Sequence, residues 1–84
     1  MRTQDVIHIV VLTPEKTILD VYASKVSLPG SLGSFVVLNN HAPLISSLEK
    51  GYIIYEVAGA EHRLMITTGF VEVCNNEVIV CAEV

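Results

Sequence analysis

The feature that most constrains the fold is a regular alternation between short β-branched apolar runs and turn-forming residues. Gly, Pro, Asn or Asp interrupts the runs at intervals of roughly 8 to 12 residues, a spacing typical of β-sandwiches and barrels. No stretch shows the periodicity of an amphipathic helix. Strands are expected at residues 6–12, 17–21, 23–28, 34–38, 44–48, 52–57, 62–67, 70–74 and 77–82. The pattern therefore predicts an all-β fold of about nine strands.

The last two runs predict a hairpin whose register can be worked out. A two-residue Asn75-Asn76 loop would place Cys74 opposite Glu77, because a tight turn fixes the pairing of the strands that it joins. One face of this hairpin is then wholly aliphatic: Val71, Val73, Val78 and Val80. The other face mixes charge with apolar bulk: Phe70, Glu72, Cys74, Glu77, Ile79 and Cys81. We expect the first face in the core and the second exposed or covered by a partner.

The length of 84 residues predicts a single domain, residues 1–84. A hydrophobic fraction of 51% and a mean hydropathy of +0.55 are high for so small a soluble protein, whose large surface is normally polar. Some apolar surface is therefore expected to be covered by another chain.

Several classes of location and partner are disfavoured. No apolar run approaches the roughly 18 to 20 residues of a membrane helix, and the first five residues lack the features of a signal peptide. We expect a cytosolic chain. The net charge is −4 and the five Lys and Arg residues are scattered, so neither nucleic acid nor anionic lipid is an expected partner.

The two cysteines are expected to remain free thiols. In the hairpin register, Cys81 lies opposite Phe70 and about 13 Å along the ladder from Cys74, beyond the reach of a disulfide. Their spacing in the sequence fits neither a metal pair nor a catalytic cysteine with a neighbouring histidine. Packing is the simplest role for both.

No residue pattern indicates an enzyme, a cofactor site or a metal site. The histidines His8, His41 and His62 lack metal-ligand spacing, although distant strands of a sandwich could still bring them together. A nucleophile elbow and the phosphate-binding and dinucleotide-binding glycine motifs are all missing from the sequence. The glycines of Gly30-Ser31-Leu32-Gly33 are better explained by a tight connection between strands.

Four segments, in order and with matching gaps, carry a family resemblance. They are Leu12-Thr13-Pro14-Glu15-Lys16; Val26-Ser27-Leu28-Pro29-Gly30 followed by Gly33; His41-Ala42-Pro43-Leu44; and Thr68-Gly69-Phe70-Val71-Glu72-Val73. Each alone is weak, but together the chain resembles the N-terminal β-sandwich domain of the epsilon subunit of the rotary, proton-translocating ATP synthase. Pro43 also fits the start of an edge strand, since it has no N–H to donate.

The resemblance implies a flattened sandwich of nine to ten antiparallel strands in two sheets, each of five strands in the family. It implies a non-catalytic subunit of the central stalk, without cofactor or metal, bound to the gamma subunit and to the ring of c subunits. The chain would thereby help to couple proton translocation to ATP synthesis. It would lie at the cytoplasmic face of the bacterial inner membrane, attached to the membrane only through the complex.

The resemblance also assigns contacts to individual residues. The ring-facing residues would be Ser31, Leu32, Gly33, Ser34, Phe35, His41, Ala42 and Pro43, and the gamma-facing residues Thr13 and Phe70. Ser34 stands where the family commonly has an acidic residue, and Asn39-Asn40 replaces a frequent Pro-Gly. A ring contact through hydrogen bonds, or through packing of Leu32 and Phe35, is therefore expected in place of a charge pair.

Family members usually continue into a C-terminal helical hairpin that can inhibit ATP hydrolysis, whereas this sequence ends at Val84. A naturally short form without the hairpin is expected, and a piece cut at the domain boundary is the alternative. Two other functions stay open: a stand-alone β-sandwich binding module, and a metal-dependent β-barrel enzyme that uses the three histidines.

Overall fold

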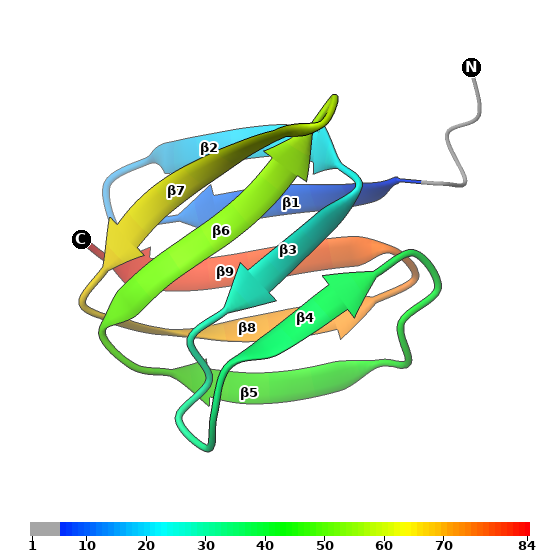
Figure 1. Cartoon of the computed structure of the whole chain (residues 1–84). Coiled ribbons are helices and arrows are strands. Elements are labelled where there is room, and N and C mark those ends of the chain that lie inside the picture. The colour runs from blue at the N-terminus through cyan, green and yellow to red at the C-terminus, as the bar shows by residue number, and fades with distance from the viewer. Residues whose placement is uncertain (1–5) are drawn as a thin grey trace.

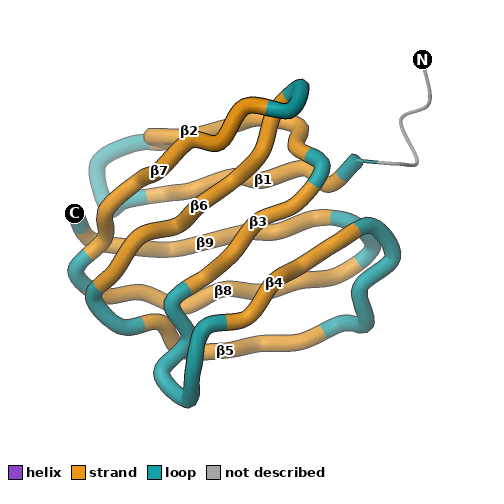
Figure 2. Tube along the Cα trace, viewed as in Figure 1, coloured by secondary structure: helices purple, strands orange, loops and turns teal. Residues whose placement is uncertain are grey.

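The computed structural model describes residues 6–84, which form two packed β-sheets (Figures 1 and 2). The strands are β1 (Ile7–Leu12), β2 (Thr17–Ala23), β3 (Lys25–Leu28), β4 (Phe35–Leu38), β5 (Leu44–Leu48), β6 (Gly51–Val57), β7 (Ala60–Ile66), β8 (Thr68–Cys74) and β9 (Glu77–Glu83). All nine predicted strands are confirmed, with ends that shift by no more than two residues. The predicted all-β sandwich is therefore confirmed.

Two of the expectations about membranes concern different parts of the chain. None of residues 6–84 belongs to a helix that is long and apolar enough to cross a membrane. The argument against a signal peptide concerned residues 1–5, which lie outside the described residues.

The sheets differ from the expectation in the number of strands and in the direction of one strand pairing. The large sheet has the order β2-β1-β9-β8-β5 and the small sheet the order β4-β3-β6-β7, so only one of the two sheets has five strands. The expectation of antiparallel pairing is wrong for β1 and β9, which pair in parallel. A parallel pair needs a long crossover connection, and here residues 13–76, which include the whole small sheet, supply it.

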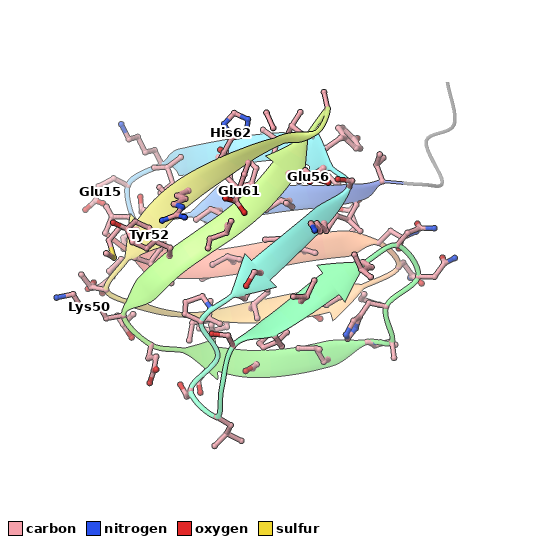
Figure 3. The ribbon with its side chains drawn as sticks, viewed as in Figure 1. Glu15, Lys50, Tyr52, Glu56, Glu61 and His62 are labelled. Carbon is pink, nitrogen blue, oxygen red and sulfur yellow. The ribbon has the colours of Figure 1, made fainter. Side chains whose placement is uncertain are left out.

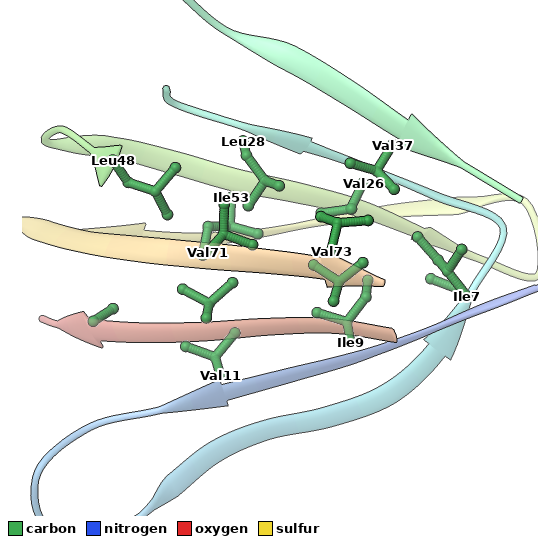
Figure 4. Close-up of a cluster of buried hydrophobic side chains, with 14 of the residues drawn as sticks. Ile7, Ile9, Val11, Val26, Leu28, Val37, Leu48, Ile53, Val71 and Val73 are labelled. Carbon is green, nitrogen blue, oxygen red and sulfur yellow. The ribbon is translucent and has the colours of Figure 1, made fainter. Parts of the chain in front are cut away.

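The core lies between the two sheets (Figure 4). Alternate residues of each strand point inward, so aliphatic side chains from both sheets meet there. The buried residues are Ile7, Ile9, Val11, Ala23, Val26, Leu28, Val37, Leu48, Ile53, Ile66, Val71, Val73, Val78, Val80 and Ala82. The predicted buried face of the last hairpin is confirmed, since its four valines are at most 1% exposed.

The predicted register of that hairpin is also confirmed. Cys74 pairs with Glu77, and Phe70 pairs with Cys81. Both turn residues have positive φ, 52° at Asn75 and 63° at Asn76, as the favoured two-residue hairpin turn requires. Cys74 and Cys81 are free thiols, as expected.

Candidate partner interfaces

The outer face of the large sheet is an exposed surface with many apolar side chains. Pairing between strands places alternate residues on this face. Three large side chains stand out there: Tyr22 is 61% exposed, Ile45 75% and Phe70 54%. No other part of residues 6–84 covers this face (Figure 1). Exposed apolar surface of this kind is typical of a protein interface.

A shallow groove of about 500 Å³ lies at the edge of this face, where β1 ends and β8 begins. Its lining residues are Leu12, Thr13, Pro14, Thr68, Gly69, Phe70, Cys81, Ala82 and Glu83. The groove therefore brings together Thr13 and Phe70, the two residues for which the sequence predicted a common partner. They come from opposite ends of the chain, so their proximity is a product of the fold.

The turn from Thr13 to Lys16 and the close contact of β8 with β9 at Gly69 shape the groove. The Thr13 hydroxyl donates to the Lys16 carbonyl oxygen at 3.0 Å and accepts from the Lys16 N–H at 3.3 Å, which fixes the turn. A Cβ added to Gly69 would lie 2.6 Å from the carbonyl oxygen of Cys81. Gly69 therefore lies against β9, and any side chain there would displace the two strands that line the groove.

His8 lies on the same face, and its partners there were not predicted from the sequence. Its Nε2 lies 2.7 Å from Asp20 on β2, and its Nδ1 lies 3.0 Å from Glu77 on β9. The ring stacks on Tyr22 with centroids 4.5 Å apart. The hydrogen bond to Asp20 raises the pKa of His8; burial opposes the change, and the bond to Glu77 and both nearby charges reinforce it.

The loop between β3 and β4 is a rigid projection. The Ser31 N–H donates to the Ser47 carbonyl oxygen at 3.0 Å, and the Ser47 hydroxyl donates to that of Ser31 at 2.9 Å. A Cβ at Gly30 would lie 2.6 Å from the carbonyl oxygen of Gly33, and Gly33 has a φ of 130°. Leu32 at the tip is fully exposed. The tight connection predicted from the two glycines is confirmed.

The predicted ring-facing residues fall into two groups. Phe35 is half-buried and packs against the core, so Leu32 is the apolar group that the loop presents. His41, Ala42 and Pro43 lie at the opposite end of β4, about 13 Å away at the rise of a four-residue strand. Both groups border the edge of the sandwich formed by β4 and β5 (Figure 1).

The turn before β5 is held by contacts between backbone and side-chain groups. The N–H of Asn40 donates to the Asn76 side-chain oxygen at 2.6 Å, and Nδ1 of His41 lies 2.7 Å from the Ala42 carbonyl oxygen. Pro43 directly precedes β5, which is an edge strand. The predicted role of Pro43 at a strand entrance is confirmed.

The three histidines do not converge. His8 lies on β1, His41 in the turn before β5, and His62 on β7, where it stacks on Tyr55 at 5.2 Å. Within residues 6–84, no group of three or more His, Cys, Asp or Glu side chains is arranged to hold a metal ion.

Comparison with known proteins identifies one family. The family described as ATP synthase, Delta/Epsilon chain, beta-sandwich domain matches residues 6–84. Relatives named ATP synthase epsilon chain include one from Anaeromyxobacter sp. (strain K), 41% identical over 87% of this chain and 55% of the relative. Another, from Desulfitobacterium hafniense (strain DSM 10664 / DCB-2), is 45% identical over the same shares. The chain spans about half the length of the curated relatives it matches.

Two solved structures share the fold. One is a chain in the cryo-EM structure of Euglena gracilis mitochondrial ATP synthase, OSCP/F1/c-ring, with a TM-score of 0.87 and 20% identity over 93% of this chain and 51% of that one. The other belongs to the central stalk and c-ring of Tetrahymena thermophila mitochondrial ATP synthase, with a TM-score of 0.77 and 19% identity over 93% and 63% of the two chains.

Proposed function

This chain belongs to the delta/epsilon-chain β-sandwich family of ATP synthase, and from that premise we propose that it is a non-catalytic subunit of the central stalk. In this role it links the gamma subunit to the ring of c subunits and helps to couple proton translocation to ATP synthesis. It works at the cytoplasmic face of the bacterial inner membrane, and the complex holds it there.

The outer face of the large sheet is the proposed contact with gamma, and this exposed apolar surface is the observation that carries the proposal. Phe70 stands on the face and Thr13 borders it, and the two line one groove. An interface core is typically apolar and aromatic, with a polar rim. The face combines apolar and aromatic side chains with charged ones, and a partner that covered it would remove Tyr22, Ile45 and Phe70 from water.

The β4–β5 edge is the proposed contact with the c ring. Leu32 projects from the tip of a loop that is hydrogen-bonded to β5 and therefore enters an interface with little loss of conformational freedom. Ser31, Gly33 and Ser34 flank Leu32, Phe35 supports the base of the loop, and the turn His41, Ala42, Pro43 lies at the far end of the same edge. The contact is apolar and hydrogen-bonded, without a charge pair.

A rigid domain between two partners can transmit torque without chemistry of its own. The proposed gamma and ring contacts lie on different surfaces, and strand β5 contributes to both, with Ile45 on the outer face and Ser47 bonded to the ring-facing loop. The packed core between the sheets resists deformation. Rotation of one partner would therefore turn the other.

The test is recovery of partners from membranes of the source organism. The tagged chain is purified under conditions that keep the synthase intact, and the proteins recovered with it are identified by mass spectrometry. We expect gamma and c, together with the catalytic alpha and beta subunits. Recovery of the chain alone, from membranes whose synthase is otherwise intact, would contradict the stalk function and favour a stand-alone binding module.

A further inference from the structure

Charge is distributed unequally between the two sheets. The five strands of the large sheet contain no lysine or arginine, whereas the small sheet carries Lys25 and Arg63. The large sheet has four acidic residues: Asp20, Glu72, Glu77 and Glu83. Strand pairing places all four on the outer face. The apolar face proposed for docking is therefore also acidic.

Three of these carboxylates either pair with His8 or lie at the border of the face. Asp20 and Glu77 share His8 between them, at 2.7 and 3.0 Å. Glu83 lies at the last position of β9, at the border of the face. Only Glu72 combines a central position with the lack of a cationic partner among residues 6–84.

Apolar residues surround Glu72. Strand pairing places it directly opposite Ile45 on β5 and Ile79 on β9, at a separation where side chains touch. Phe70 lies two residues before it on the same side of β8. A shallow hollow of about 360 Å³ adjoins Glu72, lined also by Pro43, Leu44, Ile45, Val73 and Cys74. The hollow offers room for a side chain from outside the sheet.

A partner that covers this face must compensate the negative charge of Glu72. Removal of water from a carboxylate among apolar groups is strongly unfavourable unless an opposite charge replaces the water. The described part of the chain provides no such charge beside Glu72, so the covering surface has to bring one.

We propose that Glu72 determines the specificity of this face by pairing with an arginine or lysine of the covering protein. The partner surface then has a defined chemistry: an apolar patch that packs on Ile45, Phe70 and Ile79, with one cationic side chain that enters the hollow beside Glu72. The inference rests on the proposed function, in which gamma is the covering protein, and it adds the charge that gamma must present.

The experiment measures the Kd of the chain for the purified gamma subunit of the same synthase. The variant Glu72→Gln keeps the shape of the side chain and removes the charge. Glu61→Gln is the matched control, because it removes the same charge from the outer face of the small sheet, where Glu61 lies (Figure 3). We expect Glu72→Gln to raise the Kd about 30-fold or more, as for loss of one member of a buried charge pair. Glu61→Gln should bind as the unmodified chain does.

Three outcomes separate this inference from the stalk function. If the two variants weakened binding of gamma equally, the cause would be the change in net charge, and the proposed pairing would be overturned. Tight binding of both variants would overturn it too and leave the stalk function intact. Failure of the unmodified chain to bind gamma would overturn both. Thermal unfolding of Glu72→Gln should match that of the unmodified chain, since the Glu72 carboxylate has no hydrogen-bond partner within residues 6–84.

Discussion

The charge state of His8 is set by side chains from two neighbouring strands. Asp20 is twelve residues away in the chain and Glu77 is sixty-nine residues away, yet each accepts a hydrogen bond from one ring nitrogen. Tyr22 covers one side of the ring. An imidazolium has two N–H donors, so this arrangement fits the protonated form best and joins β2, β1 and β9 on the outer face.

His8 should make stability depend on pH. Because the folded chain raises the pKa of His8, its contribution is complete below about pH 6.5, its ordinary value, and disappears as pH rises through the raised pKa. The unmodified chain should have a higher free energy of unfolding in urea than His8→Gln. This difference should be about 0.5 to 1 kcal/mol larger just below pH 6.5 than at high pH; it is small because both carboxylates are exposed. Parallel pH curves for the two proteins would contradict this.

Phe70 is the aromatic side chain on which the gamma contact should depend most. It is 54% exposed on the outer face of the large sheet, so Phe70→Asp adds a charge to the proposed interface while it leaves the core intact. We expect recovery of gamma with the tagged chain to fall at least tenfold, as for a central interface residue. The midpoint of urea unfolding should change little.

Tyr52→Asp is the matched control for Phe70→Asp. Tyr52 is 47% exposed on the outer face of the small sheet (Figure 3). The control should retain gamma. Equal loss in both variants, or an unfolding shift as large as the loss of binding, would show that Phe70 supports the fold and not the contact.

At the scale of single residues, sequence could locate what depends on local geometry. The inward valines of β8 and β9 followed from one turn, Asn75-Asn76. The partners of His8 did not, because they depend on how β1 pairs with β2 and with β9. No local pattern encodes the second of these pairings.

At the scale of elements, the loop between β3 and β4 depends on a position where only glycine fits. A Cβ at Gly30 would meet the carbonyl oxygen of Gly33 at 2.6 Å and the Phe35 ring at 2.9 Å. The ring could move but the backbone could not without displacing the loop. Leu32 would then lose its fixed position above the β4–β5 edge.

Gly30→Ala should therefore lower the free energy of unfolding by about 1 to 3 kcal/mol, the usual effect of overpacking, and reduce recovery of c while gamma is retained. Glu61→Ala, at an exposed position on the outer face of the small sheet and outside both proposed contacts, should change neither. Denaturant unfolding and partner recovery would be measured on the same preparations. Unchanged stability of Gly30→Ala would mean that the loop accommodates the methyl group.

The positions of the elements were readable from sequence, but part of their arrangement was not. Most strand ends were predicted from strong turn residues, such as Thr13-Pro14 and Asn75-Asn76, although the connections at Ser24 and Thr67 contain no such residue. The parallel pair of β1 and β9 was missed because residues 13–76 separate the two strands. The small sheet has four strands instead of five, and no feature of the individual runs indicates which sheet a strand will join.

At the scale of the whole molecule, the domain should be more stable in its complex than alone. A chain of this length buries only about 60 to 65% of the surface that its unfolded form exposes, and the outer face of the large sheet leaves Tyr22, Ile45 and Phe70 in water. A partner that binds only the folded chain shifts the equilibrium away from unfolding.

With gamma at 100 times its Kd, the free energy of unfolding of the chain should rise by about 2.7 kcal/mol. Because the rise comes from mass action on the whole domain, strands of the small sheet should gain protection from hydrogen exchange together with those of the large sheet, although the proposed gamma contact involves only the large sheet. Protection confined to β1, β8 and β9 would show that gamma shields a surface without stabilising the fold. The sandwich would then not act as the single rigid body that transmission of torque requires.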